Sequence, residues 1–147
     1  MPINFFSKSE TYREFSNFAP FPIELDGKAW PSTENYYQAQ KFTDDALQEK
    51  IRTAKKPVIA KKLAQKHRNK ARADWAEVKD AVMERAVRCK FEQHAALREL
   101  LKSTGDEDLA EAAPNDYYWG VGADGTGQNR LGLLLMRLRS ELRGEAP

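Results

Sequence analysis

The segment 21–42 contains the strongest local folding signals in the chain. Asp26-Gly27 is a typical two-residue hairpin turn, and the residues on either side of it have strand character. A proline follows the second strand, and Ser32 or Thr33 is then a suitable helix N-cap. Because neither Gly nor Pro interrupts the residues that follow, the sequence predicts a hairpin that leads directly into a helix ending near Phe42.

Capping residues and apolar spacing predict that most of the remaining chain is helical. Further helices are expected in five segments: 44–53, 57–66, 75–91, 95–103 and 129 onward. Extended segments are expected at three places: 3–6, 109–113 and 117–119. The apolar residues suffice for a single core, in which we expect Trp30 and Trp75.

The size and charge of the chain fit one domain with a well-solvated surface. It has 147 residues, of which 31% are charged, and a formal net charge of +2 that indicates no particular partner. The charge is unevenly distributed, and one segment holds eight cations without an acid: Lys55, Lys56, Lys61, Lys62, Lys66, Arg68, Lys70 and Arg72. Such a segment is typical of a solvated helical face, and it also suits a phosphate-rich partner such as nucleic acid.

Cysteine and histidine usage argues against disulfide and zinc chemistry. Cys89 is the single cysteine, and its spacing from His67 and His94 is not that of a zinc site. Within an amphipathic helical pattern, Cys89 is expected to be a buried, inert thiol. The N-terminus lacks signal-peptide character and no apolar run has membrane-spanning length, so we expect a cytoplasmic protein that needs no metal or organic cofactor.

Four polar and aromatic residues share one face of the helix predicted after the hairpin. Glu34, Tyr37, Gln38 and Lys41 are separated by three, four and seven positions. The helix dipole alone is a sufficient structural reason for Glu34 in the first turn and for Lys41 near the end. An aromatic ring among a carboxylate, an amide and an ammonium is also typical of one wall of a solvated site, in which Glu34 acts as an acid or base.

A second group of candidate residues lies near the C-terminus. Asp116 follows a Pro-Asn pair, where turn geometry is its ordinary role, and Trp119 leads into the glycine-rich segment 120–127. An indole beside glycine can offer a flat face for stacking a base, and glycines can expose backbone amides to phosphate, although the segment matches no known phosphate-binding fingerprint. Two carboxylates, a stacking aromatic ring and an amide-rich loop would suit cleavage of a glycosidic bond to a base.

These motifs resemble the NADAR family along nearly the whole chain. The first group of matching residues is Phe15-Ser16-Asn17-Phe18, Trp30, Ser32, Glu34, Tyr37, Gln38, Lys41 and Phe42. The middle group is Met83, Ala86, Lys90 and Phe91. The last group is Thr104-Gly105-Asp106, Glu111, Asp116, Trp119-Gly120, Gly122, Gly127, Asn129 and Gly132. The chain departs from the family's usual residues at Phe15, which is often leucine, and at Asn35, which is often histidine.

The resemblance implies an α+β fold in which residues 1–147 form one mostly helical domain with a small sheet or hairpin. It also implies an N-glycosidase that breaks the bond between ribose C1 and an exocyclic base nitrogen. The substrate would be ADP-ribosylated guanine in nucleic acid, in opposition to a toxin ADP-ribosyltransferase, or a ribosylamino-pyrimidine intermediate of riboflavin biosynthesis. An alternative is a module that binds ADP-ribose or a related nucleotide without turnover.

The same resemblance implies roles for individual residues. The catalytic candidates are Glu34, Asp116, Trp119 and Lys41. The substrate-binding candidates are Ser16, Asn17, Phe18, Tyr37, Gln38, Gly120, Gly122 and Asn129. Everything in this assignment requires that two carboxylates far apart in the sequence serve one substrate.

Overall fold

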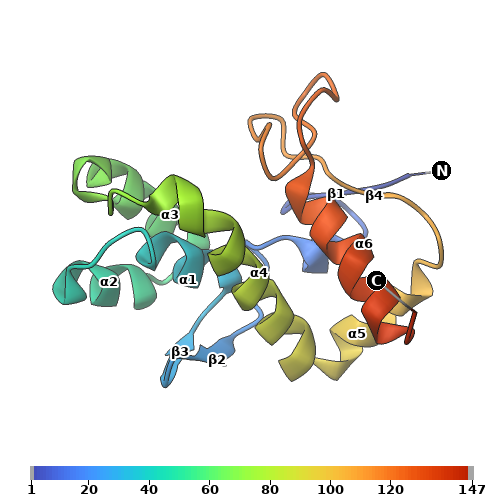
Figure 1. The fold of residues 1–147 in the computed structure, drawn as a ribbon, viewed down its shortest axis with the longest axis horizontal. Helices are drawn as coiled ribbons and strands as arrows, with labels where there is room; N and C mark the ends of the chain where they lie inside the picture. The colour runs from blue at the N-terminus through green and yellow to red at the C-terminus, as the bar shows by residue number, and fades with distance from the viewer. Residues whose placement is uncertain (1, 146–147) are drawn as a thin grey trace. The chain divides into compact units, whose positions relative to one another are not determined.

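The computed structural model describes residues 2–145, and its contacts divide the chain into two compact units (Figure 1). The central unit is Pro20–Gln93, and the terminal unit combines Met1–Ala19 with His94–Pro147. Each unit is described by itself below. That residues 1–147 act as one domain stays a prediction, and residues 1, 146 and 147 lie outside the described part.

The central unit begins with the predicted hairpin. Strands β2 (Ile23–Leu25) and β3 (Lys28–Trp30) pair antiparallel. The turn residues Asp26 and Gly27 both have positive φ, 56° and 75°, which is the conformation of the tight turn that matches the twist of two strands. The Asp-Gly signal is therefore confirmed.

Helix α1 (Thr33–Ala39) follows immediately, and its start was predicted correctly. The Ser32 side chain accepts a hydrogen bond from the backbone N–H of Asn35 at 3.1 Å, which caps the helix. The helix ends three residues before Phe42, so the predicted C-terminus is wrong. The N–H groups of Lys41 and Phe42 donate to carbonyls three residues back, and the Lys41 carbonyl accepts from the N–H of Arg72 at 2.7 Å. Bonds to the third residue back make the tighter turn that often ends an α-helix, and the bond from Arg72 ties this turn to the chain before the longest helix.

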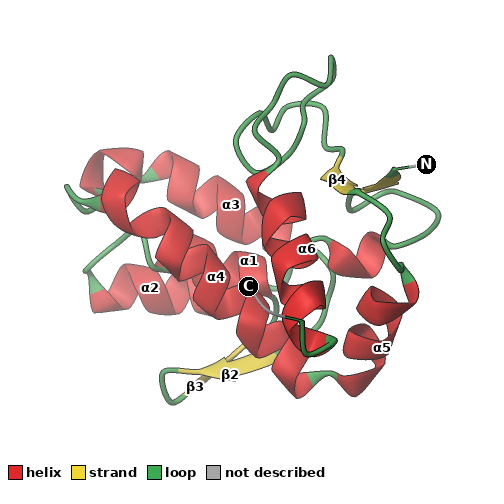
Figure 2. Cartoon of the chain, turned by 45° about the vertical axis from the view of Figure 1, so that its right-hand side comes forward, coloured by secondary structure: helices red, strands yellow, loops and turns green. Residues whose placement is uncertain are grey.

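Helix α1 is buried along its whole length by three other helices of the unit (Figure 2). They are α2 (Asp45–Arg52), α3 (Pro57–Lys66) and α4 (Trp75–Gln93), with a short 3₁₀ turn η2 (Arg68–Lys70) between the last two. The core around α1 contains Ile23, Trp30, Tyr36, Ala39, Phe42, Ile51, Ala60 and Ala86. Small alanines on α3 and α4 let those helices approach α1 closely.

The buried polar residue Asn35 ties α1 to the end of α2. Its Nδ2 donates to the carbonyls of Ile51 at 2.9 Å and Ala54 at 3.3 Å. These carbonyls belong to the last turn of α2 and the residues after it. The Ile51 carbonyl also accepts from the N–H of Ala54 at 3.3 Å, so Asn35 adds a further donor there. Asn35 thus satisfies backbone groups that no water reaches.

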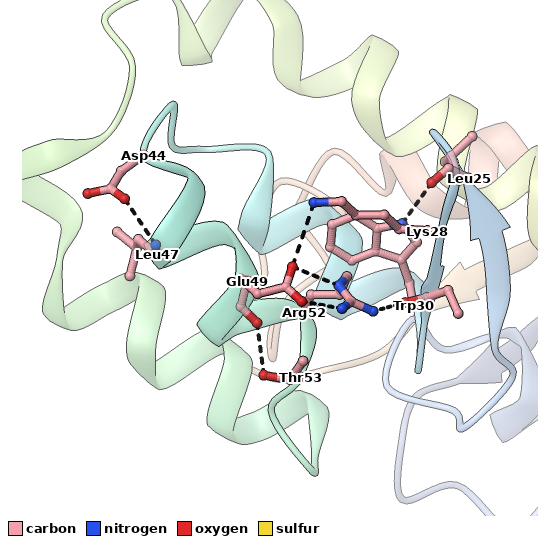
Figure 3. A network of polar contacts seen from close by, with 9 residues as sticks. Leu25, Lys28, Trp30, Asp44, Leu47, Glu49, Arg52 and Thr53 are labelled. Carbon is pink, nitrogen blue, oxygen red and sulfur yellow. Dashed lines mark hydrogen bonds and ion pairs between the residues drawn. The ribbon is translucent and has the colours of Figure 1, made fainter.

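Surface polar contacts connect α2 to the hairpin (Figure 3). Arg52 donates to the carbonyl of Ala29 at 2.9 Å and pairs with Glu49, and Lys28 lies 3.6 Å from the same carboxylate. The indole N–H of Trp30 donates to the carbonyl of Leu25 at 3.0 Å. Because exposed ion pairs stabilise little, the buried Trp30 ring does most to fix the hairpin.

The terminal unit is built on a parallel pair of short strands. Strand β1 (Ile3–Phe5) pairs with β4 (Leu109–Glu111), with Ile3 opposite Leu109. The helices of this unit are α5 (Ala95–Ser103) and α6 (Arg130–Leu142), and a 3₁₀ turn η1 covers Arg13–Phe15. Its buried core contains Phe5, Phe15, Leu101, Leu109, Leu131 and Leu135.

The fold class is α+β and mostly helical, as the family resemblance implied. No helix in residues 2–145 combines the length and apolar character needed to cross a membrane. Trp30 lies in the core as predicted, with 3% of its surface exposed. The predicted strand at 117–119 is wrong, since these residues form bends.

We predict that Asn35→Ala destabilises the protein by about 1–3 kcal/mol, because the carbonyls of Ile51 and Ala54 lose the Asn35 amide as a buried donor. Urea unfolding followed by circular dichroism measures the change. Asn69→Ala, at an exposed position of η2, is the control and should change stability little. Equal stability of the two variants would contradict the role given to Asn35.

Candidate active site

The carboxylate of Glu34 is buried in the first turn of α1. Only 5% of the residue is exposed, and its Oε2 accepts a hydrogen bond from Gln38 Nε2 at 2.5 Å. The two residues are one helical turn apart, so the helix itself sets their distance. The helix N-terminus and the amide together stabilise a negative charge at this place.

Gln38 carries an unpaired acceptor. Its Oε1 finds no hydrogen-bond partner within residues 2–145, although the residue is only 4% exposed. A carboxylate only accepts hydrogen bonds when ionised, so Glu34 fixes the amide nitrogen on its own side and turns Oε1 away. A buried acceptor left unpaired costs about 1–3 kcal/mol.

The ammonium of Lys41 lies close to two aromatic rings. Its Nζ is 5.6 Å from the centre of the Tyr37 ring and 6.0 Å from that of Trp75, and these rings are 5.1 Å apart. Burial lowers the pKa of Lys41, the negative charge of Glu34 raises it, and the positive charges of Lys61 and Lys79 lower it. At a given pH, a larger fraction of Lys41 is therefore neutral than of an ordinary lysine, and a neutral amine can act as a nucleophile.

A pocket of about 290 Å³ opens beside these residues. Its lining comes from α1, α3 and the segment leading into α4: Gln38, Lys41, Lys61, Ala64, Gln65, Arg68, Ala71 and Trp75. The prediction that Trp75 belongs to the core is wrong, because this residue is half-buried and lines the pocket. It is the first residue of α4.

In the terminal unit, Asp116 organises a turn. Its Oδ1 accepts hydrogen bonds from the backbone N–H groups of Tyr118 at 3.1 Å and Trp119 at 2.8 Å. This is the turn geometry expected after Pro-Asn, and it bends the chain where a strand was predicted. The Trp119 indole is half-buried and meets the Tyr118 ring edge to face, with centres 4.9 Å apart.

The glycine-rich segment folds back on itself. The amides of Val121, Ala123, Gly125 and Gly127 all donate to carbonyls of the same unit. Those amides are engaged, so they offer no open cradle to a phosphate. Close backbone packing explains the glycine at position 120, where a Cβ atom would collide with the carboxylate and carbonyl of Glu111 and with the carbonyl of Asp116.

The other predicted binding residues of this unit also have structural tasks. Asn129 precedes α6 and holds β4, since its Oδ1 accepts from the Glu111 N–H and its Nδ2 donates to the Leu109 carbonyl, both at 2.9 Å. Ser16 is buried and its Oγ accepts from the N–H of Phe18 at 3.1 Å. Asn17 is buried as well, at 7% exposure.

The structure therefore brings together one predicted group within the central unit: Glu34, Tyr37, Gln38 and Lys41. The second group lies in the terminal unit: Ser16, Asn17, Phe18, Asp116, Trp119, Gly120, Gly122 and Asn129. That both groups serve one substrate stays a prediction. Over residues 2–145, no group of three or more His, Cys, Asp and Glu side chains could hold a metal ion, and burial raises the pKa of the Cys89 thiol.

Comparison with known proteins gives a consistent set of relatives. The model of the NADAR domain matches residues 4–143. N-glycosidase YbiA of Escherichia coli (strain K12) is 50% identical over 140 residues, which are 95% of this chain and 88% of that protein. N-glycosidase Npun_R5314 of Nostoc punctiforme is 42% identical over 97% of this chain and 94% of that protein.

Two further matches extend this set. Riboflavin biosynthesis protein VVA0006 of Vibrio vulnificus is 42% identical over 99% of this chain, which spans only 40% of that longer protein. The NMR structure of the E. coli protein YbiA is similar with a TM-score of 0.89 and 49% identity, covering 97% of this chain and 85% of that one.

We predict that NMR titration of the lysine side-chain nitrogens finds the pKa of Lys41 below the ordinary lysine value. Glu34→Gln should lower it further, because the ammonium loses a negative neighbour, and Lys61→Gln should raise it, because a positive neighbour is removed. A pKa of Lys41 that does not respond to either substitution would refute the electrostatic coupling.

Proposed function

Because this chain belongs to the NADAR family, we propose that it is an N-glycosidase, a hydrolase that cleaves the bond between ribose C1 and a base nitrogen. The observation that carries the proposal is the Glu34 carboxylate, buried and held by Gln38 in a chain that is 50% identical to an N-glycosidase over nearly its full length. A buried and oriented carboxylate is what an oxocarbenium-like transition state requires.

In this reaction water adds across the C1–N bond. The bond breaks with its electron pair on nitrogen, which takes up a proton, and hydroxide from water attaches to C1. Glu34 stabilises the positive charge that develops on the sugar or removes the proton from water. Its hydrogen bond to Gln38 holds the carboxylate in position without a reorganisation cost.

The remaining candidates have proposed roles around this centre. Asp116 shares the proton transfer, and Trp119 holds the base by stacking. Ser16, Asn17, Phe18, Tyr37, Gln38, Gly120, Gly122 and Asn129 shape the ribose pocket. Lys41 either binds phosphate as a cation or attacks the anomeric carbon as a neutral amine. Its lowered pKa supports the second role.

Two classes of substrate fit this chemistry. ADP-ribosylated guanine in nucleic acid is supported by the exposed lysines of the basic segment, including Lys55, Lys56 and Lys62. In that case the protein opposes a toxin ADP-ribosyltransferase in the cytoplasm. A ribosylamino-pyrimidine is supported by the relatives whose names refer to riboflavin biosynthesis.

Replacing the two carboxylates tests catalysis against simple binding. We predict that Glu34→Gln and Asp116→Asn each lower turnover of an N-ribosyl substrate by about 100-fold or more, the usual contribution of an acid or base, with ADP-ribose affinity changed little. Asp45→Asn, at an exposed position of α2, is the control and should keep full activity. A wild-type protein that binds ADP-ribose and turns over neither substrate would favour the non-catalytic module.

Salt dependence separates the two substrate classes. If nucleic acid is the substrate, kcat/KM on ADP-ribosylated DNA should fall steeply between low and moderate salt, since lysines release counterions from the backbone. A free ribosylamino-pyrimidine carries few charges and should show a weak dependence. Salt-insensitive turnover of the small substrate, with none of DNA, would refute the nucleic-acid substrate.

A further inference from the structure

Lys41 lies just beyond the end of α1, so the helix alone does not fix its position. Its N–H donates to the Gln38 carbonyl at 3.3 Å, in the tight turn that follows the helix. Its carbonyl accepts a hydrogen bond from the N–H of Arg72 at 2.7 Å, which is the shorter of the two. A segment from another part of the central unit therefore holds the backbone from which the Lys41 side chain extends.

The main chain of Arg72 also holds Trp75, the first residue of α4. The Arg72 carbonyl accepts a hydrogen bond from the N–H of Trp75 at 3.2 Å. One residue thus bonds through its N–H to Lys41 and through its carbonyl to Trp75. Both of these residues line the pocket, and the Lys41 Nζ lies 6.0 Å from the centre of the indole ring. The main chain of Arg72 therefore helps to set how the amine and the ring are placed relative to each other.

The side chain of Arg72 is engaged outside the pocket. Its guanidinium forms two hydrogen bonds with Asp74, from Nε to Oδ1 at 2.6 Å and from Nη2 to Oδ2 at 2.9 Å, and Arg72 is not among the residues that line the pocket. Exposed ion pairs usually stabilise little, but a bidentate pair between residues close in sequence has a defined geometry. This pair closes the turn before α4 and keeps the main-chain groups of Arg72 in place.

Charged groups from several elements surround the amine of Lys41. Glu34 lies on α1, Lys61 on α3 and Lys79 on α4, and Arg68 of η2 lines the same pocket. Burial has a larger effect on the pKa of Lys41 than any of these charges, and it lowers this pKa. A displacement of Lys41 toward solvent would therefore raise its pKa, which makes the pKa a measure of position.

We propose that Arg72 is a positioning residue for Lys41. Its main chain ties Lys41 to Trp75, and its ion pair with Asp74 keeps that main chain in place. The inference rests on the proposed function, in which Lys41 contacts the substrate. It separates Arg72 from the other cations of the basic segment, because Arg72 acts through Lys41 and not through a contact of its own with the substrate.

NMR titration of Lys41 in the full-chain variants Arg72→Gln and Asp74→Asn tests the proposal. A pure charge effect predicts opposite signs, since loss of a positive neighbour raises the pKa of a lysine and loss of a negative neighbour lowers it. If the ion pair positions Lys41, both variants should raise this pKa toward the ordinary lysine value, because the amine becomes more exposed. Asp74→Asn is the decisive variant, and asparagine is as suitable as aspartate at a helix start.

Hydrogen exchange of the Arg72 amide measures the bond to Lys41 directly. Both variants should accelerate this exchange by about 2- to 10-fold, the change expected when one hydrogen bond is weakened. The matched control is Glu77→Gln, which removes an acid from an exposed position in the first turn of α4 that does not line the pocket. It should leave the exchange of the Arg72 amide unchanged. Thermal melting verifies that each variant is folded.

A pKa of Lys41 that falls or stays the same in Asp74→Asn would overturn the proposal, and so would amide exchange of Arg72 that is equal in all variants. In an active enzyme, Arg72→Gln and Asp74→Asn should lower kcat/KM by about 10-fold, because a small displacement of a group at the reaction centre slows the reaction strongly. Failure of the N-glycosidase proposal is distinguishable, since the wild-type protein would lack turnover while the pKa of Lys41 still responded to both variants.

Discussion

The central unit depends on burying a polar helix. All seven residues of α1 are buried, among them Glu34, Asn35 and Gln38. Removing polar groups from water costs free energy unless each finds a partner, so this helix can be buried only if its surroundings satisfy it. The capping Ser32, the carbonyls at the end of α2 and the hydrogen bond between Glu34 and Gln38 are those partners.

The buried polar side chains of α1 have hydrogen-bond partners toward α2, but one of their atoms lacks a partner among the described residues on another side. Toward α2, both hydrogen bonds of the Asn35 amide nitrogen go to backbone carbonyls, and the helix pair is fixed. On the side of the pocket, the side-chain oxygen of Gln38 is buried and has no partner within residues 2–145, and the pKa of the nearby Lys41 is lowered by burial. Such an unpaired buried acceptor costs free energy.

The sequence predicted those turns and helix starts that depend on residues close to them in the chain. The Asp-Gly turn, the Ser32 cap and the helices expected at 44–53 and 57–66 depend mainly on residues close in sequence, and each appears as expected. The end of α1 was missed, and the turn there is tied by a hydrogen bond to Arg72, thirty-one positions along the chain from Lys41, which no local signal indicates.

Tertiary contacts also explain the errors at the site. The helical spacing of Trp75 from other apolar residues predicted a core position, but in the structure it is the first residue of α4 and lines the pocket. The 117–119 segment has strand propensity, yet the Asp116 carboxylate captures two of its amides and forces a bend. Glu34, Tyr37 and Gln38 were grouped correctly because they share the helix α1, and Lys41 follows it in a tight turn. No local rule relates these residues to Asp116 or Trp119.

The crowding around Gly120 constrains how this protein can diversify. A side chain at this position, or at Gly127, would strike the backbone of its own loop, so point substitution has little freedom there. The α3 surface is different, since its lysines are exposed. Relatives that acquire new substrates are therefore expected to vary along α3 while this loop keeps its glycines. In a comparison of many such sequences, substrate selectivity would then correlate with the residues of α3, and the glycines of the loop would stay constant.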